Sequence, residues 1–206
     1  MQSFVAEMFE YYRVLPRMEL VAVLLAVGYL VLAIRQNIWC WFCAATSTAM
    51  YVYLFATAKL YMESSLNVFY FAMAVYGWLM WRSGKSDDGL PVSIWPLNVH
   101  AYAITAIVFL VAVSGFLLSS FTSAAYPYVD SATTFGAMWA TFLVARKVLE
   151  NWWYWLIIDV VSIYIYWSKG LEATAVLFIG YVILIPIGLI AWTRSYREDH
   201  AMTVPA

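Results

Sequence analysis

Two stretches of the chain decide the fold: residues 70–81, YFAMAVYGWLMW, and residues 181–192, YVILIPIGLIAW. Three residues of the first stretch recur in the second, always 111 residues later: Tyr70 as Tyr181, Gly77 as Gly188 and Trp81 as Trp192. Because only 11 of the 206 residues are tryptophan, the matches favour an internal repeat. The alternative is that apolar helices with tryptophan at the membrane interface resemble one another anyway.

The helices before these two stretches also match, with a different offset. Three residues recur 114 positions later: Asn37 as Asn151, Trp39 as Trp153 and Trp41 as Trp155. The same offset pairs Thr48 with Ser162 and Asp159 with Ala45. Lys59, after the second apolar run, is echoed by Lys169 after the sixth.

The composition excludes a soluble globular protein. Hydrophobic residues make up 65% of the chain and charged residues 11%, against about 45–50% and about 25% in soluble domains. The net charge of −1 leaves no basic surface for nucleic acid. We therefore expect an all-α polytopic membrane protein, with the lipid bilayer as its surroundings.

Charged residues delimit the membrane-spanning helices, because charge is costly in hydrocarbon. The sequence predicts seven spans: 20–34, between Arg35 and Lys59, between Glu63 and Arg82, 97–118, 128–145, 151–168 and 173–193. A turn near Ser119–Ser123 and Pro127 divides the long uncharged run 89–129.

Seven spans and a three-helix repeat predict a 3+1+3 plan. A three-helix unit repeated directly returns inverted, and one extra helix between the copies restores its orientation. The expected parts are repeat one at 20–82, a linker helix at 97–120 and repeat two at 128–194. Parallel repeats of this kind are typical of transporters, with the site near the midplane between the halves.

The basic residues orient the chain. Seven lysines and arginines fall on one side of the predicted membrane and four on the other. By the positive-inside rule, the C-terminus is cytoplasmic and the N-terminus is outside.

Polar and aromatic side chains recur at helical spacing in three spans, and such faces are expected to turn away from lipid. The candidate binding residues are Trp41, Thr48, Asn67, Tyr70, Trp78, Trp155, Asp159 and Tyr166. Interfacial belts are the alternative for the aromatics, and Thr48 can bond its own helix. Asp159 remains open between a substrate or gating contact, a structural acceptor and a proton relay.

Nothing in the sequence predicts enzyme chemistry, a metal or a cofactor. Cys40 and Cys43 lie on one face of an apolar run without further ligands, so packing is the expected role. His100 and His200 lie away from any metal-ligand partner, and we expect no catalytic role for either. A receptor or assembly subunit without a transport cycle is a remote alternative.

Two segments identify a family. They are 67–81, which begins Asn-Val-Phe-Tyr and ends Tyr-Gly-Trp-Leu-Met-Trp, and 151–171, which begins Asn-Trp-Trp-Tyr-Trp, contains Asp159 and ends Lys-Gly-Leu. They resemble the PnuC family of bacterial vitamin B3 transporters, in particular a Neisseria-type member, over about 19–194.

The resemblance implies a fold similar to the SWEET sugar transporters and a homotrimer in the bacterial inner membrane. It implies uptake of nicotinamide riboside by facilitated diffusion, with trapping by a cytoplasmic kinase. The residues that match the family motifs are Asn67, Tyr70, Trp78, Trp155 and Asp159. Related members carry thiamine or riboflavin, which are the alternative substrates.

Overall fold

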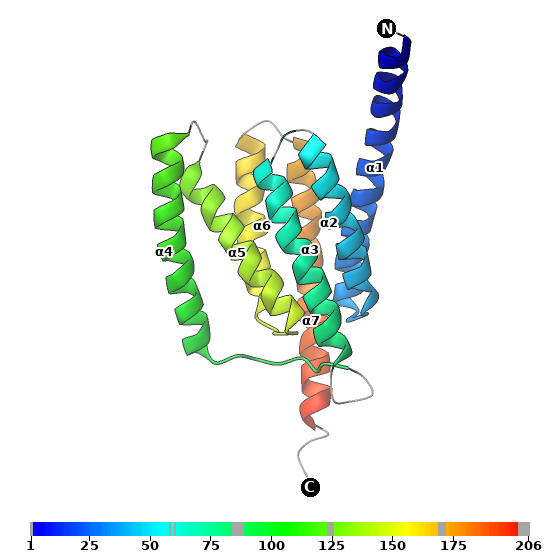
Figure 1. Ribbon diagram of the computed structural model, residues 1–206. Coiled ribbons are helices and arrows are strands. Elements are labelled where there is room, and N and C mark those ends of the chain that lie inside the picture. The colour runs from blue at the N-terminus through cyan, green and yellow to red at the C-terminus, as the bar shows by residue number, and fades with distance from the viewer. Residues whose placement is uncertain are drawn as a thin grey trace. The chain divides into compact units, whose positions relative to one another are not determined.

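The computed structural model describes residues 2–57, 59, 61–83, 89–122, 126–168 and 172–201, without the side chains of 2–16, 61–62 and 172–174. Over these residues the chain is mostly helical, and Ser93 and Val148 form an isolated β-bridge between loops (Figure 1). The helices are α1 (Gln2–Ile34), α2 (Trp39–Thr57), α3 (Tyr61–Arg82), α4 (Leu97–Phe121), α5 (Pro127–Ala145), α6 (Asn151–Ser168) and α7 (Glu172–Ala201).

The helix ends confirm most of the predicted span boundaries. α1 and α5 end at the predicted Ile34 and Ala145, and α6 covers the predicted 151–168. α1 begins 18 residues before the predicted span, and α7 continues eight residues beyond it. Charges mark where a helix leaves hydrocarbon, whereas intrahelical hydrogen bonds continue into water.

Some expectations lie outside the described residues. They concern Lys169, the Lys-Gly-Leu end of the family motif at 169–171 and the turn residue Ser123.

Three of the described helices are long and apolar enough to cross a membrane by length and composition: 17–34, 97–121 and 175–201. The other four are 18 to 22 residues long. Their tryptophans, tyrosines and hydroxyl residues lower their apolar character without shortening them. About 20 residues cross the hydrocarbon core, so their lengths also suit spanning.

The helices form two compact units, residues 1–83 and 84–206. In the first unit α2 packs against both α1 and α3. In the second, α6 packs against both α5 and α7, and α4 packs against α5. Each unit therefore has a central helix that is flanked by its two chain neighbours.

The turns before the two central helices have the same backbone structure. The Asn37 N–H donates to the Leu32 carbonyl at 2.9 Å, and the Val148 N–H donates to the Leu143 carbonyl at 2.9 Å. The preceding residues, Gln36 and Lys147, have φ of 54° and 49°. Both turns have the bond pattern of a Schellman motif with a non-glycine residue in the left-handed position, and they lie 111 residues apart.

A tryptophan from the central helix packs against a glycine in each unit. A Cβ on Gly77 would lie 2.4 Å from the Trp41 indole, and one on Gly188 would lie 2.2 Å from the Trp152 indole. Each indole also meets a second one edge-on: Trp41 and Trp81 with centroids 5.4 Å apart, Trp152 and Trp192 with centroids 5.5 Å apart.

These contacts correct the predicted offset of 114 for α2 and α6. Trp41 corresponds to Trp152, not to Trp155, so the offset is 111 here as well. The helix ends agree, because Thr57 Oγ1 donates to the Leu54 carbonyl and Ser168 Oγ donates to the Ile165 carbonyl, both at 2.8 Å. The predicted counterparts change accordingly: Asp159 pairs with Thr48 instead of Ala45, and Ser162 with Tyr51 instead of Thr48.

Replacing either packed glycine by alanine is expected to destabilise the protein, because the new methyl group would overlap the indole. We expect Gly77→Ala and Gly188→Ala each to lower stability by about 1–3 kcal/mol, measured by thermal unfolding in detergent. Gly180→Ala is the matched control, since a Cβ there meets nothing within 4 Å. Equal effects at all three positions would contradict the packing role.

Candidate functional site

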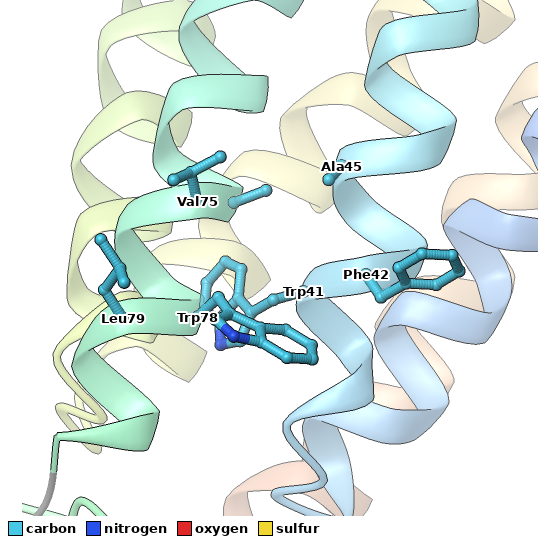
Figure 2. A pocket seen from close by; sticks show the side chains of 7 residues that line it. Trp41, Phe42, Ala45, Val75, Trp78 and Leu79 are labelled. Carbon is cyan, nitrogen blue, oxygen red and sulfur yellow. The ribbon is translucent and has the colours of Figure 1, made fainter.

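A partly open cavity of about 250 Å³ lies between α2 and α3 (Figure 2). Its lining residues are apolar: Trp41, Phe42 and Ala45 from α2, with Ala74, Val75, Trp78 and Leu79 from α3. Two of the predicted binding residues, Trp41 and Trp78, are thus brought together. Indole walls suit a planar ring, and an indole face also attracts a cation.

The two tryptophans of this cavity differ in how deeply their side chains are buried. Trp41 is 1% exposed and packs against Gly77, Trp81 and Tyr29. Trp78 is half-buried and meets Trp39 edge-on at 5.5 Å. Trp41 therefore forms the back wall of the cavity, and Trp78 has more free surface.

The other predicted residues of the first unit are Thr48, Asn67 and Tyr70, all half-buried. Thr48 Oγ1 donates to the Ala44 carbonyl of its own helix at 2.8 Å, as the simpler interpretation of a helical hydroxyl predicts. Asn67 Nδ2 donates to the Glu63 carbonyl at 2.9 Å. These local bonds hold both side chains against their own helices.

The predicted residues of the second unit, Trp155, Asp159 and Tyr166, all lie on α6. Trp155 packs against a cluster formed by Ala137, Ala140 and Ile158. Tyr166 lies against Phe178 of α7, with ring centroids 5.2 Å apart. Trp155 therefore contacts the α5 side of its unit, and Tyr166 contacts α7.

Asp159 is buried in an unusual way. The residue is 4% exposed, and within the described part of the chain its carboxylate has no hydrogen-bond partner. Ser162, one turn further along α6, is 6% exposed and likewise has no hydrogen bond there. The oxygens of Asp159 are not among the wholly buried polar atoms that lack a partner, so the carboxylate keeps a small exposed area.

One buried cation was not expected from the sequence. Lys147 is 5% exposed and lies in the turn between α5 and α6. It interacts with other groups of the chain. Among the helix residues whose side chains are described, which leaves out Arg13, no lysine or arginine is buried.

The sequence indicates no catalytic role for His100, and the structure places its side chain in a polar cluster. His100 is 7% exposed, its Nδ1 is hydrogen-bonded to the Tyr154 hydroxyl at 3.0 Å, and its Nε2 lies 3.9 Å from Glu150 Oε1. The Trp95 N–H donates to the same carboxylate oxygen at 3.2 Å. The four-residue spacing of Glu150 and Tyr154 is the only sequence signal for this cluster.

The described residues contain no group of three or more His, Cys, Asp or Glu side chains that could hold a metal ion. Neither Cys40 nor Cys43 forms a disulfide. The arrangement therefore offers aromatic faces, hydroxyl and amide groups, and one buried carboxylate, which are suited to binding.

Replacing Asp159 by asparagine tests whether its charge supports the fold. We expect Asp159→Asn to retain thermal stability in detergent or to gain up to about 1 kcal/mol, because an unpaired buried charge is removed. Asn151→Ala is the matched comparison. Asn151 is fully buried and its Nδ2 donates to the Val148 carbonyl at 2.6 Å, so we expect a loss of about 1–3 kcal/mol. A similar loss in Asp159→Asn would mean that the carboxylate is structural.

Comparison with known families gives one match over most of the chain. A family model described as nicotinamide mononucleotide transporter matches residues 17–194.

Curated relatives carry vitamin-transporter names. The nicotinamide riboside transporter PnuC of Escherichia coli is 28% identical, over 86% of this chain and 84% of its own. The PnuC of Neisseria mucosa is 25% identical, over 74% of this chain and 62% of its own. The riboflavin/roseoflavin transporter RibM of Streptomyces davaonensis is 28% identical, over 62% of each chain.

A solved structure has the same fold. The crystal structure of the vitamin B3 transporter PnuC superposes with a TM-score of 0.71, at 20% identity, over 88% of this chain and 82% of the other.

Proposed function

The chain belongs to the nicotinamide mononucleotide transporter family, and from this premise we propose that it carries nicotinamide riboside across a membrane by facilitated diffusion. The proposal is supported by the family match over residues 17–194, by the indole-lined cavity within the first unit and, within the second unit, by the buried side chain of Asp159. Nicotinamide riboside has a planar cationic ring, an amide and ribose hydroxyls. A site for this substrate needs an aromatic face to stack on the ring, hydrogen-bonding groups for the amide and hydroxyls, and a negative charge for the cation.

We assign the predicted residues to these interactions. Trp78 and Trp155 are proposed to stack on the ring, with Trp41 behind Trp78 as a wall of the cavity. The polar contacts would come from Asn67, Tyr70, Thr48 and Tyr166. Asp159 would neutralise the charge of the ring, which offsets the cost of its own burial.

The riboside is preferred to the mononucleotide because of the charge of the phosphate. A bound phosphate favours arginine or lysine partners, and none of the helix residues with described side chains is a buried lysine or arginine. The buried Lys147 lies in a turn and already has an interaction. Rejection of the phosphorylated form would let a cytoplasmic kinase trap the vitamin after entry.

Riboflavin is the second candidate substrate. The similarity to RibM covers 62% of this chain, and indole walls would also stack on an isoalloxazine ring. Thiamine, another cationic aromatic vitamin, is a further alternative in the same fold.

For the architecture we propose two parallel three-helix repeats, 20–82 and 128–194, joined by a linker helix at 97–120 as in a SWEET-like fold. Matched turns and matched glycine–tryptophan contacts at one offset support this plan. We also propose a homotrimer in the bacterial inner membrane, with the N-terminus outside and the C-terminus in the cytoplasm. A membrane enzyme and a receptor without a transport cycle would both leave the repeat unexplained.

Uptake into proteoliposomes tests the proposed function. With purified protein and no kinase, we expect saturable entry of labelled nicotinamide riboside that a protonophore does not reduce, and competition by unlabelled riboside above mononucleotide, thiamine and riboflavin. Abolition of initial uptake by the protonophore would contradict facilitated diffusion. Selective competition by another vitamin would contradict the substrate.

Trp155 is expected to contribute stacking energy. We expect Trp155→Ala to weaken binding of nicotinamide riboside by about 1–3 kcal/mol, on the scale of base stacking on aromatic side chains. Isothermal titration of the purified protein measures this. Trp155→Phe should restore part of the affinity while filling the contact with α5. The matched control is Trp153→Ala, since Trp153 is 55% exposed, and equal losses in the two alanine variants would remove Trp155 from the site.

A further inference from the structure

The imidazole of His100, on α4, is held between two side chains near the start of α6. Its Nδ1 lies 3.0 Å from the Tyr154 hydroxyl, and its Nε2 lies 3.9 Å from Glu150 Oε1. Because Nε2 faces a carboxylate, we assign the ring proton to Nε2, so that the Tyr154 hydroxyl donates its hydrogen bond to Nδ1. Glu150 Oε1 in turn accepts the Trp95 N–H at 3.2 Å. The orientation of the imidazole is therefore fixed on both sides, and its bond to Tyr154 is directional.

The first unit has other residues at the corresponding positions. At the offset of 111, Tyr154 corresponds to Cys43 and Glu150 to Trp39. A Cβ on Gly28 would lie 3.8 Å from Cys43 Sγ, so small groups pack together there. The repeated backbone arrangement thus forms with these residues too, and it does not itself require the polar cluster. A reason for the cluster has to come from what is particular to the second unit.

Tyr154 and Trp155 share one packing surface in the second unit. Both rings pack against the buried cluster formed by Ala137 and Ala140 of α5 and Ile158 of α6. Ile158 follows Tyr154 by four positions and Trp155 by three, which makes the three side chains neighbours on the surface of α6. The two alanines contribute only methyl groups, and methyl groups do not by themselves orient an aromatic ring. The hydrogen bond to the imidazole does orient the phenol ring, which then borders the space of the adjacent indole.

We propose that His100 is a positioning residue for substrate binding: by holding the Tyr154 ring, it fixes the orientation in which Trp155 meets the planar ring of the substrate. This inference rests on the proposed function and deepens it, because it gives the proposed linker helix a residue that governs affinity without touching the ligand. An aromatic side chain that is already ordered loses less entropy when a ligand stacks on it. Removal of the bond therefore weakens binding even though both rings remain in place of contact.

Binding of nicotinamide riboside to the purified full-length protein, measured by isothermal titration, tests this role. Tyr154→Phe removes only the hydroxyl oxygen and keeps the ring. His100→Leu removes both ring nitrogens, whereas His100→Asn keeps a polar atom near the position of Nδ1. Tyr164→Phe is the matched control, since Tyr164 lies on the same helix and is 70% exposed. Thermal unfolding of every variant in detergent is measured in parallel.

We expect Tyr154→Phe and His100→Leu each to raise Kd for the riboside by about three- to tenfold, the scale set by the ordering of one side chain. His100→Asn and Tyr164→Phe should raise Kd by less than about twofold on the same scale. In a Trp155→Ala background, Tyr154→Phe should cause no further rise, because contributions that act through one residue are not additive.

An unchanged Kd in Tyr154→Phe would overturn the proposal. So would an equal rise in Kd with and without Trp155, or a loss of thermal stability without a loss of affinity, since both indicate a purely structural role. Equal affinities of His100→Asn and His100→Leu would overturn it as well. Absence of riboside binding by the unaltered protein would instead contradict the proposed function, and this inference with it.

Discussion

The contact between a tryptophan ring and a glycine backbone sets the geometry of both units. At Gly77 and Gly188 the indole lies where any other residue would place its Cβ. The central helix and its following neighbour can therefore approach closely at one register only. The edge-on second indole, Trp81 or Trp192, fixes the orientation of the first. Glycine permits close helix approach in membranes generally, and here a ring fills the space that it leaves.

The register between the central helix and the helix that follows it is the same in both units. The two units therefore share one backbone arrangement and differ in their side chains. Positions that build the scaffold keep their character: Cys40 and Asn151 are both fully buried, and Trp41 and Trp152 both pack on glycine. Several of the positions that we propose for binding differ, as the pairs Thr48 and Asp159, Ala44 and Trp155, and Asn67 and Phe178 illustrate, whereas Tyr70 and its counterpart Tyr181 are identical. An asymmetric molecule needs different partners at its two ends, so the proposed site draws on the positions that have diverged.

The sequence was sufficient for the helices because charge and apolar length decide where they lie. It was misleading for the pairing of α2 with α6, because the letters Asn-x-Trp-x-Trp occur in both. Asn37 precedes α2 and its Oδ1 accepts the Trp39 N–H at 3.0 Å, whereas Asn151 already belongs to α6 and donates to the Val148 carbonyl. Identical letters thus have different roles, and only contacts with distant glycines reveal the register. The same limit applied to His100, whose partners lie 50 and 54 residues away in the chain.

The start of α4 shows how a connecting helix becomes part of one unit. Ser93 forms a parallel bridge with Val148, in which its N–H donates to the Lys147 carbonyl at 3.0 Å and its carbonyl accepts the Leu149 N–H at 2.8 Å. The Trp95 N–H and the His100 ring then meet the side chains of Glu150 and Tyr154. Three successive attachments to the start of α6 hold α4 more firmly than its contacts with α5 alone would. The backbone bridge and the side-chain contacts, together with the packing of α4 on α5, therefore attach the start of α4 to the turn between α5 and α6 and to the first turn of α6.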